Sequence, residues 1–267
     1  MSTPPPGPDP HLPARLRALS IITQGEQRIG RSWFRALTRF LDRVRPGVVG
    51  QGPSIDPGRV SDQQGFWTSE VDNEIIPVVS GVLSDAFRRV TGSGEPRTDP
   101  FVSTYLNTVG NRLVRLPDEV YALIVAEVER GIREGDGIDE VAANINILLT
   151  ATGSERWPNR ARTVARTETM GAVNAGVFRA AQLDAEERGD PAPFKVWLAT
   201  DDARTRPTHR AADQQRTLLS EPFRVGTAQL LFPGDPRGPA QEVINCRCTA
   251  LPVVLGETLD WTNRGRP

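Results

Sequence analysis

The sequence predicts an α+β fold, in which a helical N-terminal half is followed by a small α+β domain with a long helix packed on short antiparallel strands. Up to residue 188, apolar residues recur at spacings of three and four, which is the period of an amphipathic helix. From residue 193, the chain changes to short segments typical of strands, separated by Pro, Gly and Asp. With 267 residues, of which 38% are hydrophobic, the chain is long enough to bury a core.

The pattern along the chain divides it into four regions. Residues 1–13 contain six prolines and are expected to be disordered. A helical N-terminal region is expected at 14–117 and the α+β domain at 118–255, followed by a C-terminal tail at 256–267. The sequence has no apolar run long enough to cross a bilayer, and its polar, proline-rich start is unlike a signal peptide. We therefore expect a soluble protein that is made in the cytoplasm and has no contact with membranes.

Six helices make up the helical part of this prediction. In the first, the apolar residues from Trp33 to Val44 fall on one face and arginines on the other, and Pro46 is expected to end the helix. The second is expected to bend at Pro77, and the last carries a core stripe through Met170. The expected ranges are 14–44, 61–90, 101–115, 118–132, 138–150 and 160–188.

The β-rich part contains four candidate strands and one short helix. The strands are expected within 193–200, 221–225, 228–233 and 248–254. An acidic, arginine-bearing loop follows the first strand, and a helix is expected to start around Pro207. His209 and Asp213 lie four residues apart, so they would share one face of that helix.

Both cysteines of the chain, Cys246 and Cys248, lie one residue apart. A disulfide between them would close a very tight ring, so the alternatives are buried thiols, a metal pair and a redox site. His209 is the only histidine of the sequence outside the proline-rich tail. With the two cysteines it would supply three ligands for Zn²⁺, and Asp213 or Asp201 could be the fourth. Core thiols beside a hydrogen-bonded histidine remain the competing interpretation.

The core stripe of the long helix, continued toward its N-terminus, passes through Arg166. A buried guanidinium is costly unless a carboxylate meets it, so we expect an acidic partner from the β-rich part. A catalytic or anion-binding role for this arginine is the competing interpretation. The candidate partners are Asp201, Asp202, Asp213 and Glu242.

Four motifs follow one another in the second half of the chain. They are ARTE at 165–168, a W…D-x-R-T-R…H segment from Trp197 to His209, PGDP at 233–236 and INCRC at 244–248. In this order they resemble the phage Mu F-like minor head proteins, which are also known as phage head morphogenesis proteins. The resemblance covers residues 118–254, so region 118–255 is interpreted as the head morphogenesis domain. One departure is that Gln214 follows Asp213, where family members often have an Asp-Gly pair.

The resemblance implies that the residues of these motifs meet in space. It therefore strengthens the hypothesis of a metal site formed by His209, Cys246, Cys248 and Asp213, with Zn²⁺ as the candidate metal. It also implies a structural cluster around that site, made of Arg166, Glu168, Trp197, Asp202, Arg206 and Asn245.

The resemblance further implies a minor capsid protein of a tailed phage or prophage, which associates with the portal protein during head assembly and DNA packaging. Scaffold and major capsid proteins are further expected partners, and the expected location is the head interior near the portal. The first helix would be the docking arm, unless its apolar face packs in its own bundle; its candidate contact residues are Trp33, Phe34, Arg35 and Arg39.

Two other functions remain open at this point. The first is an enzyme, a hydrolase or transferase acting on nucleic acid or nucleotides, with Arg166, Glu168, His209, Asp213 and the two cysteines as its site. The second is weak DNA contact by the arginines of the first helix. The formal net charge of -1 argues against a strong phosphate-binding surface.

Overall fold

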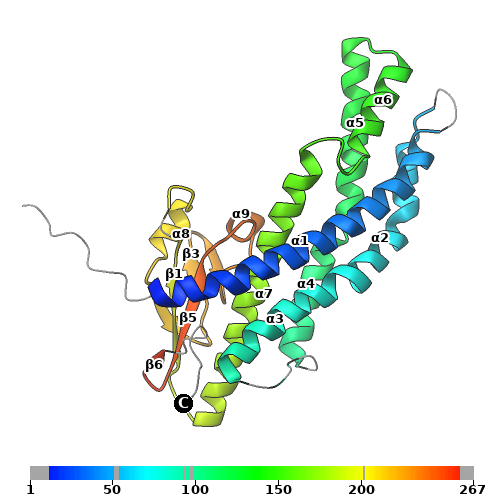
Figure 1. Cartoon of the computed structure of the whole chain (residues 1–267). Helices are drawn as coiled ribbons and strands as arrows, with labels where there is room; N and C mark the ends of the chain where they lie inside the picture. The colour runs from blue at the N-terminus through cyan, green and yellow to red at the C-terminus, as the bar shows by residue number, and fades with distance from the viewer. Residues whose placement is uncertain are drawn as a thin grey trace, which may run out of the picture. The chain divides into compact units, whose positions relative to one another are not determined.

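The computed structural model describes residues 12–50, 54–92, 94, 96, 99–200 and 202–258, and it confirms the α+β prediction (Figure 1). Two compact units are present. Unit 1 contains residues 12–27, 80–105 and 166–258, and unit 2 contains residues 28–79 and 106–165. Each unit combines segments from both sides of residue 118, and the domain boundary expected there stays a prediction. The tail expected at 1–13 lies almost entirely outside the described residues, as does most of the one expected at 256–267.

Long helices are the main feature of the N-terminal half. Helix α1 spans Leu12–Val48, α2 Gln64–Glu70, α3 Ile76–Thr91, α4 Pro100–Leu113, α5 Leu116–Glu134, α6 Ile138–Leu148 and α7 Arg156–Arg188. A 3-10 turn, η1, precedes α2 at Pro57–Gln63. Among the described residues, none of these helices combines the length and the apolar character that a membrane span requires.

Two helix boundaries differ from the sequence prediction. Pro46 does not end α1, which continues to Val48. A proline removes only its own N–H, and the N–H of Val49 still donates to the carbonyl of Arg45 at 3.0 Å, which closes the last turn. In the helix expected to bend at Pro77, a π-helical turn at Val71–Ile75 interrupts the α-helix, and α3 begins at Ile76 and includes Pro77.

Unit 2 has a core of large aromatic side chains. Trp33, Phe40 and Trp67 are each at most 1% exposed, and the rings of Phe40 and Trp67 lie 5.4 Å apart. The indole N–H of Trp67 donates to the carbonyl of Leu113 at 2.9 Å, so the one polar atom of this side chain is paired. The apolar stripe of the first helix therefore packs within its own unit.

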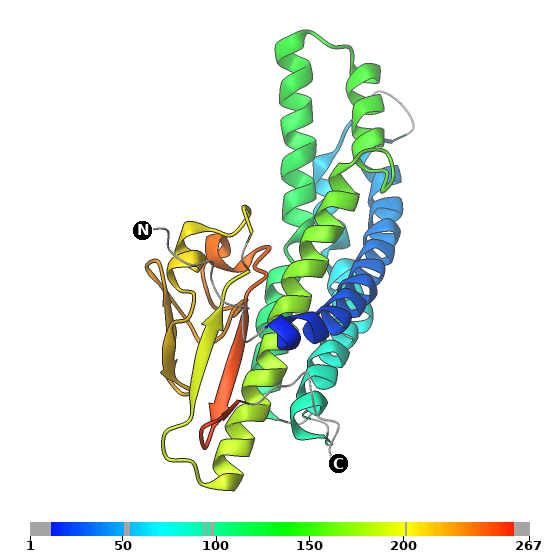
Figure 2. The same cartoon turned by 60° about the vertical axis from the view of Figure 1, so that its left-hand side comes forward.

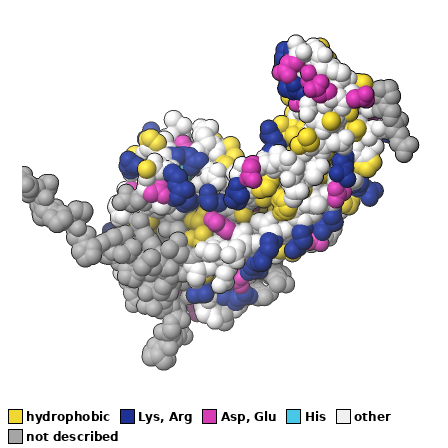
Figure 3. Space-filling view, turned by 45° about the horizontal axis from the view of Figure 1, so that its top comes forward, with side chains coloured by type: hydrophobic (Ala, Val, Ile, Leu, Met, Phe, Trp, Pro, Cys, Tyr) yellow, Lys and Arg dark blue, Asp and Glu magenta, His cyan; other side chains and the backbone are white. Residues whose placement is uncertain are grey.

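The turn between α5 and α6 carries a cluster of charges. Gly135 ends α5 with a φ of +78°, a left-handed conformation that glycine adopts without strain. Arg130 forms ion pairs with Glu127, Glu134 and Asp136 around it. Side chains of both charges are gathered over this turn, at the upper right of the space-filling view (Figure 3).

Unit 1 contains a four-stranded antiparallel sheet with the order β2-β1-β5-β6. Strands β1 and β5 are its longest, and they lie side by side (Figure 2) with Trp197 opposite Ala250. A separate hairpin is formed by β3 and β4. The strands are β1 Phe194–Leu198, β2 Arg216–Leu218, β3 Phe223–Val225, β4 Ala228–Leu230, β5 Thr249–Val254 and β6 Glu257–Thr258, and the short helices are α8 Pro207–Ala211 and α9 Ala240–Val243.

The four predicted strand segments contain β1, β3, β4 and β5, and the helix expected around Pro207 is α8. Strands β2 and β6, of three and two residues, lie outside the predicted strand segments.

Candidate functional site

Three potential ligands meet in unit 1. Nδ1 of His209 lies 3.3 Å from Sγ of Cys248 and 3.8 Å from Sγ of Cys246, and the three donor atoms all lie within 4.8 Å of one another. All three side chains are at most 2% exposed. Both cysteines are free thiols. The structure thus brings together the histidine and the two cysteines that the motifs pointed to.

Three local features of the chain place these side chains. Pro207, the first residue of α8, has a fixed φ that suits a helix start, and His209 follows within the first turn. Cys246 follows α9, and Cys248 directly precedes β5. Between α9 and the cysteines, Asn245 has a φ of +58°, a left-handed conformation that asparagine tolerates better than most residues. The turn at Asn245 leads the chain from α9 into the two cysteines.

Glu242 binds the other side of the imidazole, a role that the sequence analysis did not predict. Its Oε2 lies 3.0 Å from Nε2 of His209 and accepts a hydrogen bond from the hydroxyl of Thr208 at 2.8 Å. The side chain is buried, as expected for a carboxylate with two partners. Glu242 is the acidic residue nearest in sequence to the cysteine pair, and this proximity is the signal that could have identified it.

The two thiols have opposite tendencies to ionise. A hydrogen bond from Cys246, followed by one from His209, lowers the pKa of Cys248 against the opposing effect of burial. The same contact and burial raise the pKa of Cys246. Cys248 is therefore the more readily ionised of the two thiols.

Asp213 does not join this group, and its expected place on the same helix face as His209 is wrong. Helix α8 ends at Ala211, and residues 212–214 form a turn. Oδ1 of Asp213 accepts a hydrogen bond from the N–H of Ala199 at 2.7 Å. The other candidate for a fourth ligand, Asp201, lies outside the described residues.

Arg166 pairs with a different partner from the one expected. Its Nε lies 3.6 Å from Oε1 of Glu26 on α1, and its side chain is 33% exposed. Among the residues that the structure describes, the expected acids have other partners: Asp202 pairs with Arg247, Asp213 with the backbone of Ala199 and Glu242 with His209. The helix segments 12–27 and 166–188 belong to the same unit, so α1 supplies the carboxylate locally.

The other residues of the expected structural cluster lie around the cysteine segment. The ring of Trp197 meets the ring of His209 edge-on at 5.6 Å. Arg206 donates to the carbonyl of Ile244. The N–H of Asn245 donates to the hydroxyl of Thr167 on α7 at 3.0 Å.

Two acidic members of that cluster complete the set. Asp202 accepts a hydrogen bond from Nη2 of Arg247 at 2.7 Å, and this guanidinium holds the pKa of the carboxyl well below its usual range. Glu168, on α7, is 2% exposed. The cluster is therefore built around the backbone on both sides of the cysteines rather than around Arg166.

Asn174 anchors the cysteine segment to α7, although the sequence analysis gave it no role. Its amide nitrogen donates to the carbonyls of Pro233 and Cys248 at 3.0 and 3.1 Å, and its Oδ1 accepts from the N–H of Ala250 at 3.1 Å. The side chain is 2% exposed. One buried amide thus fixes the PGDP turn and the start of β5.

The four candidate contact residues of the first helix differ in how far they are exposed for contact with a partner protein. Trp33 is 1% exposed, and Arg39 donates to Glu70 from Nε, which lies 3.0 Å from Oε1, and from Nη2. Phe34 is half-buried, and Arg35 has a 60% exposed side chain that lies 4.0 Å from Glu74. Trp33 is therefore part of the core of unit 2.

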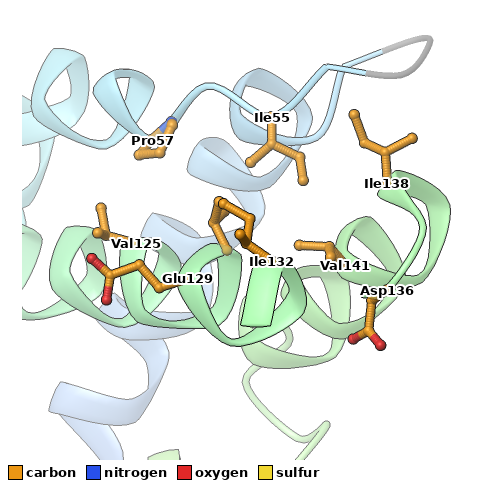
Figure 4. Close-up of a pocket in the computed structure, with 9 residues that line it drawn as sticks. Ile55, Pro57, Val125, Glu129, Ile132, Asp136, Ile138 and Val141 are labelled. Carbon is orange, nitrogen blue, oxygen red and sulfur yellow. The ribbon is translucent and has the colours of Figure 1, made fainter. Parts of the chain in front are cut away.

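Unit 2 also has an apolar groove of about 410 Å³. Ile55 and Pro57 form one side of it, and residues of α5 and α6 form the other (Figure 4). Ile132 is 75% exposed and Ile138 is 44% exposed, which is unusual for isoleucine. The remaining lining residues are Val125, Val128, Glu129, Asp136 and Val141.

Comparison with known proteins gives three findings. Residues 122–251 match the model of the family described as Phage Mu protein F like protein. The chain is 31% identical to NAD(+)–arginine ADP-ribosyltransferase EFV of Enterococcus faecalis over 148 residues. This alignment covers 55% of this chain and 29% of that protein. The chain is also 27% identical to Minor head protein GP7 of Bacillus phage SPP1 over 157 residues. This alignment covers 57% of this chain and 47% of that protein.

The chain thus spans less than half the length of either relative. No solved structure matches it. The segment matched by the family model contains the histidine, both cysteines and the ARTE and PGDP motifs. The segment at residues 122–251 is therefore a Phage Mu F-like domain, as the resemblance of its motifs indicated.

Proposed function

We propose that the chain is a minor head protein of a tailed phage or prophage, which binds the portal protein during head assembly and DNA packaging. The observation that carries this proposal is the family match over residues 122–251, together with the identity to a phage minor head protein. The proposed location is the virion, inside the head near the portal. Scaffold and major capsid proteins are further candidate partners.

The groove of unit 2 is the surface that we assign to the portal protein. An apolar patch that stays open to water is typical of a protein–protein contact. Glu129 adds an exposed carboxylate at the edge of the groove, whereas Asp136 is already paired with Arg130. A portal segment that presents an apolar side chain next to a basic residue would fit both features.

Co-expression with the portal protein encoded by the same phage or prophage tests this proposal. We expect the tagged chain to retain the portal protein, and Ile132→Asp to reduce the retained amount by about tenfold, because it places a charge in an apolar contact. Ile147→Asp is the matched control, since Ile147 is 53% exposed on α6 but does not line the groove. Absence of binding by the wild-type chain would exclude the portal role, and equal losses in both variants would exclude the groove.

An enzyme remains the second candidate function. Two observations favour it: the match to an NAD(+)–arginine ADP-ribosyltransferase, and the line of contacts from Cys248 through His209 to Glu242. The matched part is 29% of that protein, and the three residues are at most 8% exposed, so a substrate has little access to them. Turnover of NAD(+) or nucleic acid that is lost in His209→Ala would favour the enzyme over the assembly protein.

A further inference from the structure

We propose that His209, Cys246 and Cys248 bind one Zn²⁺ ion, through Nδ1 of the imidazole and the two sulfur atoms. The site would stabilise unit 1, and it is independent of whether the chain binds the portal protein. One nitrogen and two sulfur donors form a set that zinc accepts readily, and hard cations such as Mg²⁺ and Ca²⁺ prefer oxygen.

The separations of the donor atoms fit a tetrahedral ion. Zn–S bonds of about 2.3 Å and Zn–N bonds of about 2.05 Å at tetrahedral angles place nitrogen and sulfur about 3.6 Å apart. Nδ1 of His209 lies 3.3 Å from one sulfur and 3.8 Å from the other. The same bonds place two sulfurs about 3.8 Å apart, and the two cysteine sulfurs lie within 4.8 Å of each other. Both nitrogen–sulfur distances therefore lie within a few tenths of an ångström of the values that a tetrahedral zinc ion requires.

Glu242 provides the hydrogen-bond acceptor that the second ring nitrogen of a zinc-bound histidine usually has. A metal at Nδ1 requires the ring proton at Nε2, and a carboxylate that accepts this proton fixes the tautomer and the orientation of the ring. Oε2 of Glu242 lies 3.0 Å from Nε2, and the hydroxyl of Thr208 holds the same oxygen in place. The arrangement leaves Nδ1 pointing at the two sulfurs.

The charges and the backbone of the site also suit a bound ion. Two thiolates and Zn²⁺ sum to zero, so the ion would remove the cost of burying the negative charge of the sulfurs. Asn174 and Thr200 hold the carbonyls of Cys248 and Arg247 at 3.1 and 2.8 Å, which fixes the backbone that carries the ligands.

Water or another oxygen donor can fill the fourth position of such an ion. Next to Cys246, the buried Oδ1 of Asn245 has no hydrogen-bond partner among the residues that the structure describes. The proposal itself requires only the three protein ligands.

Elemental analysis of the purified full-length chain, expressed with zinc in the medium, is the direct test. We expect about one zinc per wild-type chain, and less than about a tenth of that in Cys246→Ser and in Cys248→Ser, since each loses a thiolate ligand. Asp213→Asn is the control: its carboxylate binds the backbone of Ala199, so this variant keeps its zinc.

A second measurement avoids variants that fail to fold. The wild-type chain is stripped with a chelator and titrated with Co²⁺, and absorption from thiolate-to-cobalt charge transfer is expected to saturate near one equivalent. Wild-type protein that contains no zinc and shows no such absorption would overturn the proposal. Zinc that persists unchanged in both cysteine variants, or another metal in its place, would overturn it as well.

Discussion

Oε2 of Glu242 lies 3.0 Å from Nε2 of His209, while the other nitrogen of the ring faces Cys248 at 3.3 Å. The imidazole therefore connects a carboxylate to a thiol across a buried site. If the proposed zinc ion is present, Glu242 orients a ligand without touching the metal.

The first prediction concerns this orienting role. Glu242→Gln should weaken zinc binding by about 10- to 100-fold without abolishing it, because the amide accepts the ring proton less well than a carboxylate. Competition with a chromogenic chelator measures the affinity. Glu221→Gln, a change at an exposed residue, should leave the affinity unchanged. An unchanged affinity in Glu242→Gln would indicate that the carboxylate does not orient a metal ligand.

The second prediction concerns Asn174. Asn174→Ala should lower the free energy of unfolding by about 3 kcal/mol, because it leaves two carbonyls and one N–H without their buried partner. Urea unfolding followed by circular dichroism measures the change. Asn146→Ala, at an exposed position of α6, is the control, with an expected effect within about 0.5 kcal/mol. A similar small effect at Asn174 would mean that water replaces its contacts.

The sequence predicted the elements better than it predicted the partners of individual side chains. The helices and the longer strands follow from periodicity, and the meeting of His209 with the two cysteines follows from their occurrence in one set of motifs. The contacts of Asn174 and the pair between Arg166 and Glu26 join segments far apart in the chain. No local pattern encodes which carboxylate reaches an arginine, so Glu26 was not among the partners expected for Arg166.

The place of Asp213 shows a second limit of sequence patterns. Its spacing from His209 predicts a shared helix face only if the helix continues, and α8 ends at Ala211. A helix of five residues gives no periodic signal from which its end could be predicted. Glu242, by contrast, lies in the four-residue helix α9 directly before the cysteine segment, and its role depends on the way the turn at Asn245 brings the two together.

The third prediction concerns the glycines that follow the ARTE motif. A Cβ at Gly176 would meet the backbone carbonyl of Leu83 at a distance that Cβ atoms do not adopt, so α3 and α7 pack too closely in unit 1 for any side chain there. Gly176→Ala should therefore lower the free energy of unfolding by about 2–3 kcal/mol. Thermal unfolding measures this effect.

Gly65 provides the matched control for that change. It lies in α2, and a Cβ added there would have no atom within 4 Å. Gly65→Ala should raise the free energy of unfolding by about 0.5–1 kcal/mol, since alanine loses less backbone entropy in a helix. If both variants were equally stable, the close approach of α3 and α7 would be contradicted.

The fourth prediction uses Lys195, the only lysine of the sequence. Its side chain is fully buried in β1, where Nζ donates to the carbonyl of Leu219 at 2.8 Å and lies 4.8 Å from the centre of the Phe178 ring. Burial lowers the pKa of Lys195 from 10.5 to about 7, and the nearby carboxylates of Asp235 and Glu221 only partly oppose this. The folded chain therefore releases this proton at a lower pH than the unfolded chain does.

Between about pH 7 and 10.5 the unfolded chain holds more protons than the folded chain, so the free energy of unfolding gains a contribution from Lys195 that rises with pH. Below pH 7 both states are protonated, and the cost of the buried charge is fully present. Lys195→Met removes that cost. We expect the variant to be more stable than the wild type by about 2 kcal/mol at pH 6, a value reduced by the lost hydrogen bond to Leu219.

The stability difference between Lys195→Met and the wild type should then shrink as the pH rises toward 10, because the wild-type lysine becomes neutral in the folded state. Urea unfolding at pH 6, 8 and 9.5 measures it. Arg204→Met, whose parent side chain is 76% exposed, should show a difference that does not change over this range. A difference for Lys195→Met that is equally constant would mean that the ammonium stays charged in the folded protein, held by the carbonyl of Leu219 and the aromatic rings around it.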